Sequence, residues 1–419
     1  MRDIGFSAPL KAPESLQVPH LLRSLSVVLV VLVFVAASVP IPAVAWSVIG
    51  HQLITKYAIE SLPSSPWRQL FGYYSWFLTD AVTYPDVYYR GIDPREGARH
   101  YVDLEVWNPK DPSTGTLPQA VEEFGSRMQL AIEAKDWNSA LLYAGRIAHY
   151  VEDDTQPYHT TVNYDPISNA GVGLHAVLDS SMVNHWSEIH ITPPSDSMTP
   201  IGNLTIFALN LAIQSHSFLS TINQTLINEG LNWSPELTKI IENRTNTAIT
   251  AVARVWYTVI VGAKSSPPDM PMPNRLSIVF ENSLPTNNGL VATRLRVVDS
   301  LGVSTYADVT LRAASATLRG QVTNVVPPIG EYVIVSETGL QPNDSITAQR
   351  EGYVAATVVI AVDTTAGDVV SQNQPITSLT SSQTRSNVRA VPDVTIIALV
   401  LMLAAILALM VLRKTSKNS

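Results

Sequence analysis

Three side chains that bind metal ions in proteins lie within one short stretch, residues 149–159. His149 and Asp153 are four residues apart, and His159 follows Pro157 by two residues. On a helix, residues four apart project from the same face, so this imidazole and this carboxylate would be neighbours. Pro157 cannot continue such a helix, and the turn after it can bring His159 back from another direction. One segment could then serve two adjacent metal ions.

A second pair with the same spacing follows, because His175 and Asp179 are also four residues apart. A single pair of this kind is usually a solvated pair on a helix surface, worth about 0.2–0.5 kcal/mol. Two pairs separated by a proline corner instead favour a metal site. Imidazole nitrogens and carboxylate oxygens are the ligands that zinc accepts where no thiolate is present, and this chain has no cysteine.

The segment from His149 to Asp179 resembles the signature of the zinc-dependent phospholipases C and the single-strand-specific zinc nucleases, which share one mostly helical fold. That signature is similar to His-x-x-Gly-Asp-x-x-Gln-Pro-x-His followed by His-x-x-x-Asp or His-x-x-x-Glu. The Gln-Pro-x-His part matches without a gap and places Asp153 at the ligand position. This chain has Glu152 in place of the usual glycine, and Asp154 follows, so the predicted site holds additional negative charge.

Residues 1–45 have the pattern of an export signal, in which basic residues precede an apolar run over 25–39 and a small-x-small cleavage site ends at Ala45. A retained membrane anchor is the alternative, although the apolar run is short for a membrane span. Cleavage after Ala45 would leave Trp46 as the new N-terminus.

The segment from Trp46 to His51 is similar to the Trp-x-x-x-Gly-His opening of the nuclease branch. In the family, the mature chain begins with this tryptophan, whose α-amine and carbonyl oxygen bind a zinc ion together with a nearby histidine. The resemblance therefore implies that Trp46 and His51 are ligands and that removal of the signal completes the site.

Asp86 and His100 are separated by fourteen residues, and Asp103 follows in the sequence His-Tyr-Val-Asp. The family has an aspartate and then a His-aromatic-x-Asp segment at a similar separation, so the resemblance implies that Asp86 and His100 are further ligands. Asp80 is the alternative aspartate, and the spacing favours Asp86. The aromatic residues between 73 and 89 are typical of a core, or alternatively of a pocket mouth that stacks on a base or enters a lipid interface.

Three zinc ions are therefore expected by resemblance. The family assigns Asp86, His100, His149 and Asp153 to the first ion, His159, His175 and Asp179 to the second, and Trp46, His51 and Asp153 to the third. Asp153 would bridge two ions. Asp86 would also orient or deprotonate the attacking water, a catalytic role taken from the phospholipase branch.

The chain of 419 residues is long enough for two domains with appendages. Residues 119–155 and 201–264 have apolar positions three and four apart, which is typical of helices. The last of these segments, around Trp256, resembles the closing helix of the phospholipase branch. We assign residues 46–264 to a mainly α, multi-helical catalytic domain of the zinc phospholipase C type. Three histidines match no ligand of the family and are assigned structural or surface roles: His185, His190 and His216.

The remainder of the chain has a different texture. Proline-rich residues 265–274 predict a linker. Residues 275–362 alternate β-branched and polar residues between turn signals, which predicts a small all-β sandwich-like domain that serves as a spacer or adhesion module. Residues 363–393 are rich in Ser and Thr and predict a flexible stalk.

Residues 394–412 form an apolar run long enough for a transmembrane helix, and residues 413–419 contain Lys and Arg, which favours a cytoplasmic tail. We therefore expect a single-pass protein of the cell membrane whose catalytic domain lies outside. The positive mean hydropathy agrees with added membrane segments. The net charge of −8 argues against a protein that coats nucleic acid.

The expected function is zinc-dependent hydrolysis of phosphodiesters, with a zinc-activated hydroxide attacking the phosphorus of phospholipid headgroup esters at the outer cell surface. The Trp256 helix, the lack of cysteine and the membrane tether favour phospholipase C. Asp179 in place of glutamate and the Trp46 opening favour the alternative, an extracellular single-strand-specific nuclease, for which nucleic acid would be a substrate and not a stable partner. A non-catalytic surface-display protein with a metal-bound helical domain is the other alternative.

Overall fold

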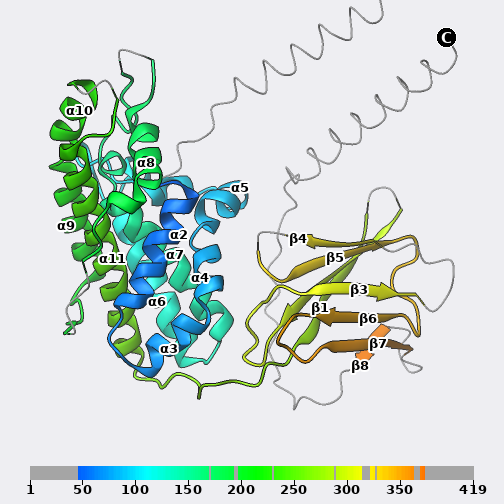
Figure 1. The fold of residues 1–419 in the computed structure, drawn as a ribbon. Coiled ribbons are helices and arrows are strands. Elements are labelled where there is room, and N and C mark those ends of the chain that lie inside the picture. The colour runs from blue at the N-terminus through cyan, green and yellow to red at the C-terminus, as the bar shows by residue number, and fades with distance from the viewer. Residues whose placement is uncertain are drawn as a thin grey trace, which may run out of the picture. The chain divides into compact units, whose positions relative to one another are not determined.

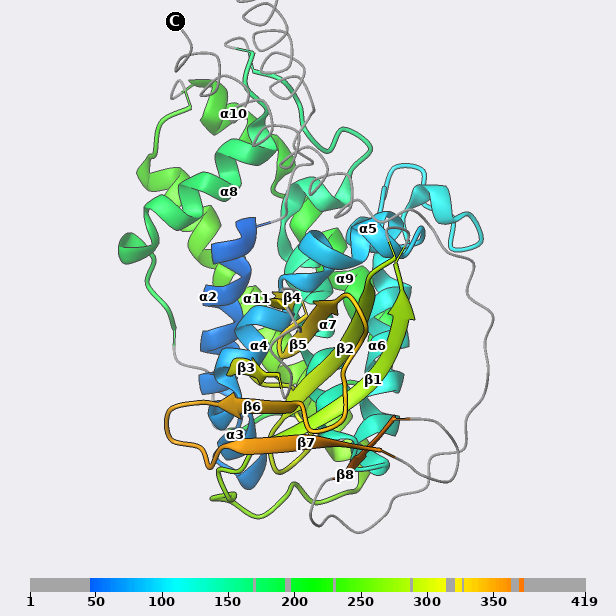
Figure 2. The same cartoon turned by 90° about the vertical axis from the view of Figure 1, so that its right-hand side faces the viewer.

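The computed structural model describes residues 46–168, 171–192, 197–228, 231–286, 289–313, 321–325, 328–362 and 369–372. All of them belong to one compact unit. Along the chain the α-helices come first and the strands follow. Figure 1 shows the helices gathered in one part of the unit and the strands in another, and in the turned view of Figure 2 the strands lie in front of the helices. The expectation of a mainly helical domain followed by a small all-β domain is therefore confirmed.

The longer helices of the first part are α2 (Ser47–Ser61), α3 (Pro66–Tyr73), α4 (Ser75–Ala81), α6 (Leu117–Glu133), α7 (Trp137–Thr155), α8 (Leu174–Asn184), α9 (Leu204–His216), α10 (Leu219–Asn228) and α11 (Pro235–Ala263). Shorter helical turns join them: the π-helix η1 (Pro85–Tyr89), α5 (Arg90–Ile92), and the 3-10 helices η2 (Gly97–His100), η3 (Pro112–Thr114), η4 (Pro157–Thr160) and η5 (Trp186–Glu188).

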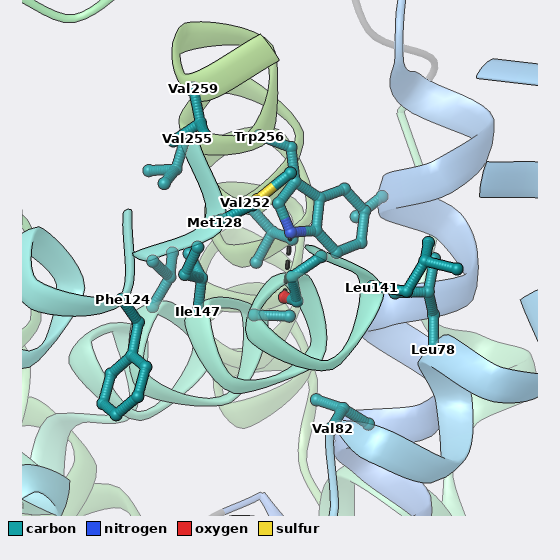
Figure 3. Packing of buried hydrophobic residues seen from close by; sticks show 14 of the residues in the cluster. Leu78, Val82, Phe124, Met128, Leu141, Ile147, Val252, Val255, Trp256 and Val259 are labelled. Carbon is teal, nitrogen blue, oxygen red and sulfur yellow. Dashed lines mark hydrogen bonds between the residues drawn. The ribbon is translucent and has the colours of Figure 1, made fainter. Parts of the chain in front are cut away.

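Helix α11 packs against α7 through Trp256, which is fully buried. Its indole nitrogen donates a hydrogen bond of 2.9 Å to the carbonyl oxygen of Ala144 in α7, the contact drawn in Figure 3. Its ring meets Phe71 of α3 edge to face at 5.1 Å. A buried indole needs such a partner for its N–H, and this contact fixes α11 on the helix that holds His149 and Asp153.

Helix α7 begins and ends where its sequence dictates. The side chain of Asp136 accepts a hydrogen bond from the backbone N–H of Ser139 at the N-terminus, which satisfies one of the free donors there. At the other end, Gln156 is extended because a residue before proline avoids the helical region. The Gln156 side chain then accepts from the N–H of Tyr158 at 2.6 Å and starts η4, which contains His159. The chain therefore turns at Pro157.

The second part contains β1 (Ser277–Pro285), β2 (Val291–Val298), β3 (Asp308–Arg312), β4 (Gln321–Val325), β5 (Glu331–Ser336), β6 (Ser345–Gln349), β7 (Ala356–Val362) and β8 (Val369–Gln372). They form two antiparallel sheets, with the strand orders β1-β2-β5-β4 and β3-β6-β7-β8. One hydrophobic core holds side chains from both sheets, among them Ile278, Leu295, Ile346 and Val358. Two sheets around a shared core make a sandwich.

Strand β8 lies within residues 363–393, which the sequence assigned to the stalk. The strand is only four residues long and lies among polar residues, so it has no alternation that sequence patterning can detect. The predicted signal (1–45), transmembrane helix (394–412) and tail (413–419) lie outside the described residues. Among the described helices, none combines the length and the apolar character needed to cross a bilayer.

Buried hydrogen bonds connect the helical part to the sandwich. The hydroxyl of Tyr74 donates to a carboxylate oxygen of Asp299 at 2.7 Å, and the hydroxyl of Tyr84 accepts from the backbone N–H of Ile329 at 2.8 Å. Both tyrosines are at most 1% exposed, so these members of the aromatic stretch 73–89 belong to the core. Tyr84 immediately precedes η1, the turn that contains Asp86.

Candidate metal centre

Asp153 lies at the centre of the predicted ligands. It is fully buried, and its Oδ2 lies 3.3 Å from Nε2 of His149, one turn earlier on α7. The same oxygen is 2.9 Å from Nδ1 of His100 in η2, and Oδ1 is 3.5 Å from Nε2 of His51 in α2. Side chains from three separate helices therefore meet at one carboxylate.

Asp86 joins this group from η1. Its Oδ1 lies 3.6 Å from Nδ1 of His100, and its Oδ2 lies 3.8 Å from Nε2 of His149. Arg90, one turn further on, places Nε 3.2 Å from Oδ1. The alternative aspartate, Asp80, instead accepts a hydrogen bond of 2.7 Å from the hydroxyl of Tyr84. The geometry therefore favours Asp86 over Asp80. The π-helical turn that holds Asp86 belongs to a rare class often found at functional sites.

The second predicted pair meets the turn after α7. Nε2 of His159 lies 3.2 Å from Nε2 of His175, whose Nε2 is also 3.4 Å from Oδ2 of Asp179. His159 and Asp153 are connected as well, because Nδ1 of His159 is 3.9 Å from Oδ2 of Asp153. The other oxygen of Asp179 accepts a hydrogen bond of 2.8 Å from the side-chain amide of Gln156.

Trp46 also lies in this cluster. It is fully buried, and its backbone donates a hydrogen bond to the carboxylate of Asp179. Its indole nitrogen donates to the carbonyl oxygen of Glu152 at 2.8 Å. A Cβ at Gly50 would lie 3.3 Å from Cβ of Trp46 and 3.2 Å from the sulfur of Met182. Glycine at this position therefore gives the tryptophan room to pack against α8.

Three of the histidines donate a ring hydrogen bond that orients the other nitrogen toward the cluster. Nδ1 of His149 bonds the carbonyl oxygen of Val82 at 2.8 Å, and Nδ1 of His159 bonds the carbonyl oxygen of His100. Nδ1 of His51 bonds a carboxylate oxygen of Glu152 at 2.5 Å. Metal-binding histidines usually donate their second N–H to a carbonyl or a carboxylate, which fixes the tautomer. Each Nε2 then faces another predicted ligand.

The nitrogen spacing fits zinc. Nε2 of His149 lies 3.1 Å from Nδ1 of His100, and the His159 and His175 nitrogens are 3.2 Å apart. Two nitrogens on a tetrahedral zinc ion lie about 3.3 Å apart, since each Zn–N bond is about 2.0–2.1 Å. In the part of the chain that the structure describes, Oδ1 of Asp153 and both carboxylate oxygens of Asp86 accept no hydrogen bond. Buried carboxylate oxygens of this kind suit a cation.

Two groups of residues could each hold a metal ion, because the donor atoms within each group lie within 4.8 Å of one another. One group is His51, His149 and Asp153, and the other is Asp86, His100 and His149. His149 belongs to both groups, whereas the family resemblance assigns it to the first ion alone. The reason is that its ring stacks on His51, with centroids 4.2 Å apart, while its Nε2 faces His100. Asp153 and His149 therefore both lie between two candidate ion positions.

Burial sets the charges of these groups. It raises the pKa of Asp86 to about 6 and that of Asp153 to about 7, and it raises the pKa of Asp179 well above its usual value. Burial also lowers the pKa of the imidazoles of His100, His149, His159 and His175. The histidines are then neutral near pH 7, as metal ligands must be, and a divalent cation would favour the ionised carboxylates.

Sequence reasoning did not assign a role to Glu152, Gln156 or Arg90, which support the predicted ligands. In the sequence, Glu152 indicates only additional negative charge, and Gln156 is only one position of the Gln-Pro-x-His motif. Their bonding partners His51 and Asp179 are 101 and 23 residues away in the chain. Spacing between neighbours could have suggested Arg90 alone, since it lies four residues after Asp86.

The sequence matches no model of a known protein family, and no curated protein is detectably similar to it. Among solved structures, alpha-toxin of Clostridium perfringens from the avian strain SWCP aligns with 77% of this chain and 96% of its own, at 12% identity and a TM-score of 0.41. Alpha toxin from Clostridium absonum aligns with 78% of this chain and 94% of its own, at the same identity and TM-score. Likeness at this level carries no weight for the chemistry of the site, which depends on its own geometry.

Proposed function

We propose that this protein is a zinc-dependent phosphodiester hydrolase of the phospholipase C type. The observation that supports it most is the convergence on Asp153 of ring nitrogens from His51, His100 and His149, with the ring of His159 beside them. These residues come from α2, η2, α7 and η4, so the fold and not one local motif brings them together. The ligand assignments made from the sequence are part of this proposal.

Zinc bound by these residues would lower the pKa of a bound water to about 7 and neutralise charge on a phosphoryl group. Asp86 has a separate task. Its carboxylate lies beside His100 and His149, where it would orient the attacking water or accept a proton from it. Arg90, with Nε 3.2 Å from Oδ1 of Asp86, orients that carboxylate and favours its ionised form.

A lipid substrate is favoured over nucleic acid by the loop between the two histidines His159 and His175. This loop exposes Val162, Tyr164 and Ile167, which are 53%, 59% and 66% accessible. Between residues 160 and 175 the sequence contains no Lys or Arg. Exposed apolar side chains beside a site suit contact with a lipid surface, whereas nucleic-acid binding depends on cations that neutralise phosphates.

Action outside the cell is part of the same proposal. The export-signal pattern of residues 1–45 and the apolar run of residues 394–412 support it. An enzyme tethered to a membrane would meet lipid headgroups at high effective concentration.

The proposal is tested by incubating the zinc-loaded protein with phosphatidylcholine vesicles and, separately, with single-stranded DNA. We expect release of phosphocholine from the vesicles and no shortening of the DNA. Cleavage of DNA alone would replace the phospholipase proposal with the nuclease alternative. Zinc binding without hydrolysis of either substrate would favour a non-catalytic surface-display protein.

A further inference from the structure

Glu152 connects α7 to Trp46 and to helix α2 through its backbone carbonyl and both of its carboxylate oxygens. Its backbone carbonyl accepts from the indole nitrogen of Trp46 at 2.8 Å. One carboxylate oxygen accepts from Nδ1 of His51 at 2.5 Å, and the other accepts from the hydroxyl of Thr55 at 2.8 Å. Glu152 is fully buried, as are Trp46, His51 and Thr55. A single side chain and its own carbonyl thus receive three hydrogen bonds from one segment.

A buried carboxylate is costly unless hydrogen bonds compensate it, so its presence needs a reason beyond packing. Thr55 and His51 lie one turn apart on α2, and their donors reach the two oxygens of one carboxylate. The bond to Nδ1 leaves Nε2 of His51 facing Oδ1 of Asp153, at 3.5 Å. The carboxylate therefore selects both the tautomer and the ring orientation of His51.

We infer that Glu152 is a positioning residue for the metal centre, which holds His51 in the ligating orientation and fixes Trp46 beside it. The inference builds on the metal centre of the proposed function but concerns ion binding and not hydrolysis. Removal of an outer partner of a ligating histidine typically weakens metal affinity about 10–100-fold. The effect should fall on one ion, because His100 and His175 do not contact Glu152 through any of these bonds.

The test uses the full-length protein, titrated with Co²⁺ as a spectroscopic probe and with Zn²⁺ against a chelator. We expect Glu152→Leu to weaken binding of one ion about 10–100-fold and to change the cobalt absorption bands. Glu152→Gln should give a smaller loss, since its amide oxygen still accepts from His51 but has no charge. Glu60→Gln, at an exposed carboxylate on the same helix α2, is the matched control and should bind like the wild type.

A double-mutant cycle separates positioning from a general structural role. If Glu152 acts through His51, then Glu152→Gln should cause no further loss of affinity in a His51→Ala background. An equal loss in both backgrounds would overturn the inference, and so would wild-type binding by Glu152→Leu and Glu152→Gln. If the wild-type protein bound neither Co²⁺ nor Zn²⁺, the metal centre itself would be ruled out, and the proposed function with it. Normal wild-type binding with unaffected Glu152 variants would overturn only the role of Glu152.

Discussion

At the scale of single residues, Asp153 is the side chain on which the predicted centre depends most. Its two oxygens face four imidazoles, and burial raises its pKa to about 7. An ionised carboxylate between two cations would offset part of the charge of both, so we expect ionisation of Asp153 to be coupled to zinc binding.

We therefore expect Asp153→Asn to reduce zinc affinity by more than the about 10–100-fold typical of outer partners. The amide has one neutral oxygen, and its nitrogen would direct donor hydrogens at histidine nitrogens. Zinc content after dialysis against a weak chelator measures the effect. Asp308→Asn, at an exposed position of β3, is the control. Full zinc retention in Asp153→Asn would contradict the assignment.

Asp86 has a different proposed role, because its carboxylate oxygens lie 3.6 and 3.8 Å from the nitrogens of His100 and His149, where they would orient or deprotonate the attacking water. We expect Asp86→Asn to lower kcat by about 10²–10⁴-fold, the usual contribution of a general base, while KM changes little. Steady-state kinetics at matched zinc content measures this. An unchanged kcat with zinc retained would leave Asp86 without a catalytic role.

At the scale of elements, the close approach of α4 to α7 controls the position of the ligands. A Cβ at Gly145 would lie 2.7 Å from Cβ of Ala81 and 3.0 Å from the backbone nitrogen of Val82. The carbonyl of Val82 accepts the Nδ1 hydrogen of His149. Any shift of α4 away from α7 would therefore pull on a predicted ligand.

We expect Gly145→Ala to destabilise the protein by about 1–3 kcal/mol, as overpacking does, and to weaken zinc binding as well. Gly72→Ala is the matched control, because nothing lies within 4 Å of a Cβ at that helical position. The control should be neutral or slightly stabilising, by about 0.5–1 kcal/mol. Urea unfolding of both variants gives the comparison, and equal stabilities would show that α4 and α7 adjust freely.

The parts of the site that sequence patterns predicted are those with local rules. The helical spacing of His149 and Asp153 and the corner at Pro157 depend on residues a few positions apart. The role of Glu152 could not be predicted this way, because its partners His51 and Thr55 are 101 and 97 residues away. The shared position of His149 between two groups depends on how α2 packs against α7, which no pattern within either helix specifies.

The same distinction between local rules and contacts of distant residues explains which parts of the fold could be predicted from the sequence. Long amphipathic segments such as α6 and α11 repeat their apolar positions over many turns, and alternation indicates the strands of the sandwich. Sheet pairing is different, since β2 pairs with β5 and β3 with β6. Such pairings are set by packing of both sheets around one core. A strand of four residues such as β8 is too short to show a recognisable alternation of apolar and polar residues.

At the scale of the whole molecule, the site gathers elements from α2 to α8, so ion binding and folding should be coupled. Zinc at about 100 times its Kd would add about 2.7 kcal/mol of stability. For a domain of about 150–250 residues, such as the helical part, this raises Tm by about 5–10 °C. The effect should disappear with a strong chelator and return when zinc is added back.

The size of this shift should depend on pH, and the sign follows from the buried carboxylates. Without metal, the folded protein retains protons on Asp86 and Asp153 up to pH values of about 6 and 7, while the unfolded chain loses them near its ordinary value of 3.8. Their contribution to stability is therefore full below pH 3.8 and is lost as pH rises through 6 and 7. The four imidazoles with lowered pKa values act oppositely below their usual 6.5, because the unfolded chain then binds more protons.

The pKa values of the unfolded chain affect stability equally with and without zinc. The difference in Tm between the two conditions therefore depends on the pKa values of the folded protein. Zinc must displace the carboxylate protons but finds the imidazoles already neutral. We expect the zinc-induced rise in Tm to grow steadily from pH 5 to pH 8, with most of the increase between about 5.5 and 7.5, measured by calorimetry at fixed free zinc. In Asp153→Asn the increase above pH 6.5 should be reduced, since the group with a pKa of about 7 is gone. A zinc-induced shift of equal size at pH 5 and pH 8 would mean that the ion does not bind at these carboxylates.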